Sequence, residues 1–361
     1  MKILGIETSA DDTGVALIEA SGKFGTDFSF EILANVVDSQ SDLHAKYGGI
    51  YPNLAKNKHK ENLPRLLQQV LGGPDAPQID AIAVTHGPGL EPCLWTGINF
   101  AQELSKKWNI PVVPVNHMEG HIIISALTSG NDAISNFKFQ ISNEIQFPML
   151  SLLISGGHTE LILSREWMRY EYIGRTRDDA VGEAFDKVAR MLGLPYPGGP
   201  HISRLALEAR SSKLEAHFKL PRPMIHEKNF DFSFSGLKTS VLRMVEAHSP
   251  LSDELKRQIA REFEDTAADV LISKTMRAAE EHGAKSIVIG GGVSANKHIR
   301  ARFAEECEKA GILLLIPPQE FSTDNALMIA LAGYFRAQRK EFPDAHSLSA
   351  NGALKLDNTG N

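Results

Sequence analysis

The 361-residue sequence has only two cysteines, Cys93 and Cys307, and no long run of apolar residues. Two cysteines are too few for a disulfide framework and indicate a reducing compartment. The opening residues MKILGIE reach charged side chains too early for a signal peptide. No apolar run approaches the length of about 18 residues that a membrane-spanning helix needs. The sequence therefore predicts a cytoplasmic protein without a membrane segment.

An excess of basic residues is also missing. The chain has 38 Lys and Arg against 44 Asp and Glu, which gives a net charge of −6. No global positive field therefore indicates a nucleic-acid partner, and any such partner must be bound by local patches. Two patches are candidates, the run at residues 56–60 with Arg65 and the run from Lys297 to Arg302. Charge runs are usually solvated faces, so each patch is a hypothesis.

The order of predicted strands suggests a repeat within the chain. The first part has predicted strands at residues 2–6, 14–19, 30–37, 81–85 and 112–115. After a polar stretch, further strands are predicted at residues 149–155, 160–164 and 286–289. The same strand–loop–strand unit and the same strand–glycine turn–helix unit recur in the same order. The sequence predicts two related α/β domains facing each other across a cleft, with chance similarity between common units as the alternative.

These units give approximate domain boundaries. The first domain is predicted at residues 1–130, joined by the last helix at 324–340, and the second at residues 147–320. A mainly helical insert is predicted at about residues 182–280. Residues 129–146 form a polar insert between the domains. Residues 341–361 form a polar tail rich in small residues, which is predicted to be flexible.

Two histidines, His117 and His121, follow the predicted strand at 112–115. Residues four apart lie on one face of a helix, which lets a single helix supply two ligands to a transition metal. An isolated pair of this kind is more often structural. Asp324, beside the start of the last predicted helix, offers a hard oxygen ligand. Together they would make a three-point site with open positions, suited to Zn2+ or Fe2+.

The position of Glu119 argues against a zinc protease. In the H-E-x-x-H motif of these proteases the general-base glutamate directly follows the first histidine. Glu119 is the second residue after His117, roughly 200° around a helix at about 100° per residue. Its carboxylate would then point away from a metal held by His117 and His121.

Several loops carry residues that could bind or transform a ligand. Asp11 and Asp12 lie in a turn between two predicted strands, where a carboxylate could act as a base or bind a metal-bound water; a plain hairpin turn is the alternative. The loop from Ser155 to His158 is similar. Three glycines at 290–292 precede a helix opening near Asn296, which favours an anion site or close packing. Asp186 could bind a ribose hydroxyl or lie on a solvated helix face.

The motifs of this chain resemble those of the TsaD family of tRNA threonylcarbamoyladenosine biosynthesis proteins over nearly its whole length. The matching motifs are GIETS at 5–9, HAKYGG at 44–49, GPG at 87–89, NHMEGH at 116–121, SGGHT at 155–159, GEAFDK at 182–187, YPGGP at 196–200, FSFSGLKT at 232–239 and TDN at 323–325. Only the insert at 129–146 and the tail fall outside the match. So many motifs in the family's order make chance an unsatisfactory explanation.

The resemblance implies two related ribonuclease-H-like α/β domains of the actin-like ATPase and sugar-kinase superfamily. It implies transfer of a threonylcarbamoyl group from threonylcarbamoyl-AMP to the exocyclic amine of the adenosine that follows the anticodon. The tRNAs concerned read codons starting with A, and AMP is released. The implied protein partners are a TsaB-like pseudo-paralogue, a TsaE-like ATPase and a TsaC-like enzyme that supplies the adenylate.

The resemblance also implies the site residues. The metal ligands are His117, His121 and Asp324, with Fe2+ favoured over Zn2+. The adenylate contacts are Leu153, Ile154, Ser155, Gly156, Gly157, Asp186, Gly199 and Asn296, and ATP is a further possible ligand. Asp11 or Asp12 is the candidate base, and the choice between them is open. The family usually has Cys-Asp-Glu where this chain has Ala10-Asp11-Asp12, which argues against a cysteine nucleophile.

Other functions compete with this interpretation. An ATP-dependent small-molecule kinase of the same fold would catalyse Mg2+-dependent phosphoryl transfer and would tolerate replacement of His117. An inactive scaffold would resemble the family's own pseudo-paralogue, and such a protein is expected to lack the three metal residues. A metalloprotease is disfavoured by the position of Glu119.

Overall fold

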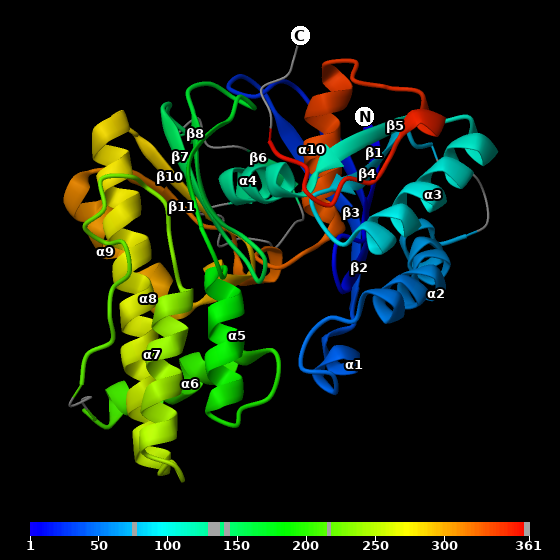
Figure 1. Cartoon of the computed structure of the whole chain (residues 1–361). Coiled ribbons are helices and arrows are strands. Elements are labelled where there is room, and N and C mark those ends of the chain that lie inside the picture. Colours follow the sequence, from blue (N-terminus) through cyan, green and yellow to red (C-terminus); the bar gives the residue numbers. More distant parts are fainter. Residues whose placement is uncertain (74–77, 129–137, 141–144, 215–217, 357–361) are drawn as a thin grey trace. The chain divides into compact units, whose positions relative to one another are not determined.

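Two β-sheets that share one order of five strands form the framework of the protein (Figure 1). The computed structural model describes residues 1–73, 78–128, 138–140, 145–214 and 218–356. The chain divides into two units, one made of Met1–Glu144 with Pro317–Asn361 and the other of Ile145–Ile316. Across the described residues, no helix combines the length and apolarity that crossing a membrane would require.

The sheet of the first unit has the order β5-β4-β1-β2-β3-β6. Its strands are β1 (Lys2–Glu7), β2 (Asp12–Ser21), β3 (Ser29–Ser39), β4 (Ala81–Gly87), β5 (Val112–Asn116) and the short edge strand β6 (Lys138–Gln140). β1, β4 and β5 run parallel, whereas β2 is antiparallel to both of its neighbours. β6 lies within the predicted polar insert, of which residues 129–137 and 141–144 lie outside the described residues.

The sheet of the second unit has the order β11-β10-β7-β8-β9. Its strands are β7 (Met149–Ile154), β8 (Thr159–Ser164), β9 (Glu171–Arg175), β10 (Ser286–Gly290) and β11 (Leu313–Leu315). The directions repeat those of the first sheet, with β7, β10 and β11 parallel and β8 antiparallel to both neighbours. Apart from the extra edge strand β6, the two sheets have one order and one set of directions, which confirms the predicted repeat of an α/β domain.

Helices cover both faces of the first sheet. α2 (Pro52–Leu71) and α3 (Glu91–Trp108) share a core with Leu4 and Ile6 of β1. Because side chains alternate along a strand, Gly5 points to the opposite face, where α10 (Ala326–Gln338) packs. A Cβ at Gly5 would lie 2.3 Å from the carbonyl oxygen of Ala326. The glycine therefore permits the close approach of α10 to the sheet (Figure 1).

Two further helices of the first unit follow strands. The short helix α1 (Ser41–Ala45) comes after β3, and α4 (His117–Thr128) directly continues β5. α2 begins with Pro52, whose missing N–H is tolerated in the first turn, and ends at Gly72 in the left-handed conformation with φ 68°. These local signals fix where α2 starts and stops.

The helices of the second unit are α5 (Val181–Met191), α6 (Gly198–Ser211), α7 (Ser235–Ala247), α8 (Asp253–His282) and α9 (Lys297–Ala310). The long helix α8 is capped by Ser252, whose side chain accepts the N–H of Leu255, and it ends at Gly283 with φ 62°. Phe185, Phe263 and Ile287 are buried members of one core that joins α5, α8 and the sheet.

The described part of the predicted flexible tail, residues 341–356, packs against the turn that follows β4. The N–H of Asn351 donates to the carbonyl of His86 at 2.9 Å, and the N–H of Gly89 donates to the carbonyl of Gly352 at 3.2 Å. Leu348 is buried in the core of the first unit. The few apolar side chains of this polar segment therefore attach it to the domain.

Candidate metal centre and neighbouring loops

His117, His121 and Asp324 lie together in the first unit. Each offers one ligand atom, and these atoms all lie within 4.8 Å of one another. The Nε2 atoms of His121 and His117 are 3.1 Å and 3.4 Å from Oδ1 of Asp324. The arrangement joins two neighbouring turns of α4 to a residue 203 positions later in the chain.

The residue before α4, Asn116, determines where the helix with the two histidines begins. Asn116 ends β5, and its side-chain oxygen accepts the N–H groups of Met118 and Glu119 at 2.9 Å and 3.4 Å. This cap starts α4 at His117 and leaves His121 one turn further along the helix. The two imidazole rings have centroids 4.8 Å apart and planes at 88°.

Asp324 comes from the segment that leads into α10. The next residue, Asn325, caps this helix by accepting the N–H of Met328 at 3.1 Å. Gly120 lies where α4 packs against α10, and a Cβ there would be only 3.1 Å from side-chain atoms of Ile329 and Met328. Close packing of the two helices brings Asp324 within reach of the histidines.

Burial and charge distinguish the three side chains. His121 is 1% exposed and His117 is 7% exposed, whereas Asp324 is 21% exposed, so the site opens on the side of the aspartate. Burial alone would lower the pKa of His117, but the carboxylates of Asp324 and Glu7 raise this pKa well above its usual value. Burial likewise acts to raise the pKa of Asp324, and the two histidines bring it well below its usual value.

These residues fit a divalent transition metal. Two imidazole nitrogens and one carboxylate oxygen form a donor set typical of Zn2+ and non-haem Fe2+. The ligand atoms converge from one helix and one helix start, and the partly exposed carboxylate leaves coordination positions on the open side.

Glu7, which lies in the GIETS motif at the end of β1, contacts this site. Its side chain is fully buried at the end of β1, and Oε2 lies 3.1 Å from Nδ1 of His117. Burial acts to raise the pKa of Glu7, but the charge and hydrogen bond of His117 lower it overall. The only sequence signal was a charged residue at the end of an otherwise apolar strand.

Glu119 points away from the candidate ligands, as the sequence predicts. Its carboxylate is 1% exposed and accepts a hydrogen bond at 2.5 Å from Nε of Arg336 on α10. Arg336 also pairs with Glu341 at 2.7 Å. Because Glu119 is held by a cation on another helix, it cannot serve as the general base of a zinc protease.

Asp12 lies close enough to the metal residues to interact with their charges. Burial and repulsion from Asp324 raise its pKa to about 7, against a weaker opposing hydrogen bond from Ser39. Its Oδ1 atom is buried and has no hydrogen-bond partner within the described part of the chain.

His59 belongs to a predicted basic patch but is fully buried beneath the loop that carries Asp11 and Asp12. Its Nε2 lies 3.0 Å from the carbonyl of Ala10, and its Nδ1 lies 2.8 Å from the hydroxyl of Thr13. Burial lowers the pKa of His59, which favours the neutral ring. The histidine therefore holds both ends of the Asp11-Asp12 loop.

Carboxylates neutralise other members of the two predicted basic patches. Lys58 pairs with Glu61 at 3.0 Å, and Arg65 pairs with Asp38. In the second patch, Arg302 pairs with Asp269 at 2.6 Å. These patches remain hypotheses for tRNA binding.

The second unit holds the predicted adenylate contacts at the carboxyl ends of β7 and β10, the edge at which parallel α/β sheets bind ligands. Leu153 and Ile154 are buried in β7, and the hydroxyl of Ser155 accepts the N–H groups of Gly157 and His158 at 3.3 Å and 3.1 Å. A Cβ at Gly156 or Gly157 would meet no atom within 4 Å, so the loop borders open space.

Asp186 and Gly199 meet at the start of α6. The carboxylate of Asp186 accepts the N–H of Gly198 at 2.7 Å, and its pKa is raised by burial against the opposing hydrogen bonds of Gly198 and Gly199. Asn296 makes contacts within the fold at the start of α9. Its side-chain oxygen caps α9, and its Nδ2 donates to Ser203 at 2.9 Å and to Glu264 at 2.7 Å.

Neither cysteine is suited to nucleophilic chemistry. Both are buried, and burial raises the pKa of Cys93 to about 12 and that of Cys307 to about 11. Both thiols therefore stay protonated at neutral pH, which fits the expectation that no cysteine nucleophile is used.

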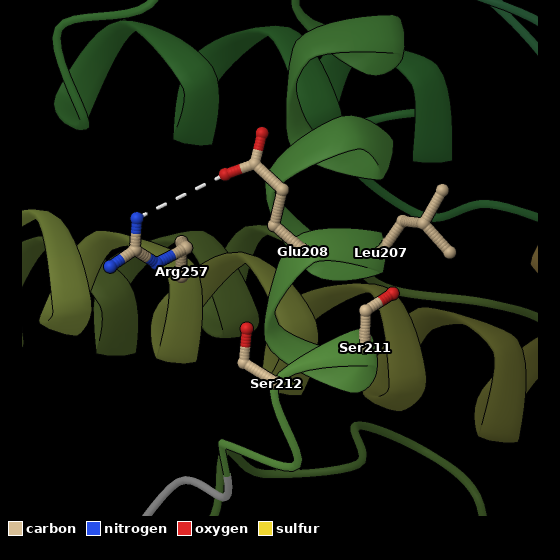
Figure 2. Close-up of a pocket in the computed structure, with 5 residues that line it drawn as sticks. All are labelled: Leu207, Glu208, Ser211, Ser212 and Arg257. Atoms are coloured by element: carbon tan, nitrogen blue, oxygen red, sulfur yellow. Dashed lines mark ion pairs between the residues drawn. The ribbon is translucent and has the colours of Figure 1, made fainter.

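A surface depression lies in the second unit. Figure 2 shows its lining, which consists of Leu207, Glu208 and Ser211 of α6, Ser212 at the end of that helix, and Arg257 of α8. Glu208 and Arg257 form an ion pair at 4.0 Å across it. None of the predicted site residues lines this depression.

The sequence is similar throughout to one enzyme family. The model of the family "tRNA N6-adenosine threonylcarbamoyltransferase" matches residues 31–331. A protein of that description from Persephonella marina is 42% identical over 362 residues, which cover 99% of this chain and 96% of the relative. One from Bacillus cereus is 43% identical, with 98% and 96% covered, and one from Thermosipho africanus is 41% identical, with 99% and 100% covered.

Solved structures share the fold at low sequence identity. Full-length HypF in a phosphate- and nucleotide-bound form matches with a TM-score of 0.53 and 13% identity, covering 95% of this chain and 47% of HypF. HypF of T. kodakarensis also gives 0.53 and 13%, with 96% and 50% covered. With the repeated sheets, this likeness confirms the predicted α/β fold.

Proposed function

The chain belongs to the tRNA N6-adenosine threonylcarbamoyltransferase family, and from this premise we propose how its residues carry out the transfer. The family match spans both units, so the chain is a transferase that modifies an adenosine of tRNA. The match also decides against the small-molecule kinase that the fold alone would allow. The group transferred is threonylcarbamoyl, and we propose threonylcarbamoyl-AMP as its donor.

The observation that carries the proposal is the convergence of His117, His121 and Asp324. When bound, a divalent metal supplies a Lewis acid that polarises the carbamoyl carbonyl or holds the threonyl carboxylate. We favour Fe2+ over Zn2+, because two histidines and one carboxylate with open positions are the donor set of non-haem Fe2+ sites. The chain's own contribution is to fix three ligands and leave the side of Asp324 open.

Asp12 is the proposed proton acceptor. The exocyclic amine of adenine is a poor nucleophile and must lose a proton as its nitrogen bonds to the carbamoyl carbon. The bond from that carbon to the phosphate oxygen breaks, AMP leaves, and the proton passes to the carboxylate. The buried, unpartnered Oδ1 of Asp12 and its pKa of about 7 suit a base that works near neutral pH.

The loops of the second unit are proposed to bind the adenylate. The open space above Gly156 and Gly157 supports a role in holding the phosphate through backbone N–H groups. Asp186 would accept a ribose hydroxyl in addition to the N–H of Gly198. Open space at Gly199 would admit the nucleoside, while Asn296 would act by fixing the start of α9. ATP would occupy the same contacts.

The partners follow from the family. tRNA is the substrate, and the proposed protein partners are a TsaB-like pseudo-paralogue, a TsaE-like ATPase and a TsaC-like enzyme that makes the adenylate. We propose that the protein acts with them in the cytoplasm. The test is transfer of labelled threonine to tRNA in a mixture of the purified partners. Modified tRNA should form only when this chain is present, and equal modification without it would contradict the proposal.

A further inference from the structure

Glu7 is a fully buried carboxylate that receives three hydrogen bonds. Its Oε1 accepts the N–H of Ser9 at 2.5 Å. Its Oε2 accepts the hydroxyl of Thr85 at 2.6 Å and lies 3.1 Å from Nδ1 of His117. All of these groups belong to the first unit, at the ends of β1, β4 and β5.

The fold alone gives no reason for a charge at this position. Burying a carboxylate is costly unless the charge is paired, and an apolar residue of similar size would fill the space without this cost. In the described ranges, no lysine or arginine pairs with Glu7, and His117 is its one ionisable partner. The contact with His117 therefore calls for a functional explanation.

We propose that Glu7 is a positioning residue that orients the imidazole of His117 for metal binding. A carboxylate that accepts the proton of Nδ1 leaves the lone pair of a neutral imidazole on Nε2. Nε2 is the atom that faces Asp324, at 3.4 Å. Glu7 thus selects the nitrogen that binds the metal and fixes the direction of the ring.

The two candidate histidine ligands differ in whether Nδ1 has a hydrogen-bond partner. Nδ1 of His121 is buried and finds no hydrogen-bond partner among the described residues. Of the two ligands, His117 is therefore the one whose Nδ1 is held by a hydrogen bond. The orientation of the site depends on Glu7, which makes that bond. Since Glu7 also binds the N–H of Ser9, the same carboxylate fixes the start of the loop that carries Asp11 and Asp12.

The variant Glu7→Gln tests this role directly. An amide has one acceptor oxygen, so its NH2 group must face either the N–H of Ser9 or the ring of His117. When it faces His117 it donates to Nδ1, the ring proton moves to Nε2, and that nitrogen no longer binds a metal. Loss of a carboxylate behind a histidine ligand weakens metal binding by about 10- to 100-fold.

The readout is metal affinity, measured on the full chain with Co2+ in competition with a chelator. The absorption bands of Co2+ also report its ligand geometry. Glu7→Gln should raise the Kd for Co2+ about 10- to 100-fold and alter the bands. Glu7→Asp, which retains a carboxylate one methylene further away, should lie between the wild type and Glu7→Gln. If Glu7→Gln folds poorly, the Co2+ affinity of Glu7→Asp still tests the role of Glu7.

Glu119→Gln is the matched control. Glu119 is also a buried carboxylate and lies on the helix of His117, but it pairs with Arg336. This control should bind Co2+ with the affinity of the wild type. Equal affinities and spectra for Glu7→Gln and the wild type would overturn the inference, as would equal weakening in the control. The inference rests on the proposed metal site, and failure of the wild type to bind Co2+ would overturn both.

Discussion

The carboxylate of Glu119 accepts a hydrogen bond from Arg336, although Glu119 lies between two histidines that face a candidate metal site. One helical turn therefore carries two kinds of side chain. His117 and His121 face Asp324, whereas Glu119 faces α10 and joins the two helices. The structure thus separates the residues that fit metal chemistry from a residue that stabilises the fold.

Removal of Glu119 should reduce stability without weakening metal binding. In Glu119→Gln, Arg336 loses the negative charge of its buried partner but keeps Glu341 and is partly exposed. We expect the free energy of unfolding to fall by about 1–3 kcal/mol, the range for unpairing a hydrogen-bonded charge. Urea denaturation measures this change. An unchanged midpoint, or a loss of metal affinity, would contradict the assigned role.

Asp12→Asn should abolish the pH dependence of the transfer step. The wild-type single-turnover rate should rise with pH through about 7 as Asp12 becomes a carboxylate. The variant should be slower by about 100-fold or more, with a flat profile. Asp11→Asn is the matched control and should retain the wild-type profile. If the single-turnover rate of Asp12→Asn still rises with pH, Asp12 is not the base.

Asp12→Asn should also increase the stability of the folded protein above neutral pH. The pKa of Asp12 is raised in the folded protein from 3.8 to about 7. Between these values the native state holds a proton that the unfolded chain has lost, so stability falls as pH rises through this window. Asp12→Asn avoids this loss and should denature at higher urea than the wild type at about pH 8. A destabilised variant at that pH would show that Asp12 serves the fold.

Substitution of Gly157 should affect the donor substrate selectively. A side chain at this position meets no atom within 4 Å, so Gly157→Val should leave the thermal unfolding temperature nearly unchanged. The added group would occupy the space proposed for the phosphate and should raise KM for threonylcarbamoyl-AMP about tenfold or more. Gly73→Val offers a control, because Gly73 also borders open space and lies in the first unit. Wild-type KM in Gly157→Val would exclude this loop from the donor site.

Apolar runs were enough to predict the central strands of both sheets, because β1 and β7 are buried along nearly their whole length. The edge strands β6, β9 and β11 were not predicted, because they are short and carry no long apolar run. The spacing of His117 and His121 likewise follows from helix geometry. The contact with Asp324 spans 203 positions and depends on the return of α10 to the first sheet, which no local pattern encodes.

Other features depend on tertiary context that the sequence does not display. His59 stands among lysines and was interpreted as part of a basic patch, yet it is buried against Ala10 and Thr13. Asn296 is a predicted adenylate contact, and its cap on α9 and its bond to Glu264 are visible only in the structure. Glu7 resembles an ordinary polar residue after a strand until the position of His117 is known.

Metal content and transfer activity, measured on the same preparations, test the central claim most directly. The wild type should hold one divalent transition metal per chain and transfer threonylcarbamoyl to tRNA with its partners present. Asp324→Asn and His117→Ala should lose the metal and the transfer together, while Glu119→Gln should keep both. Transfer at the wild-type rate by metal-free Asp324→Asn would contradict the account.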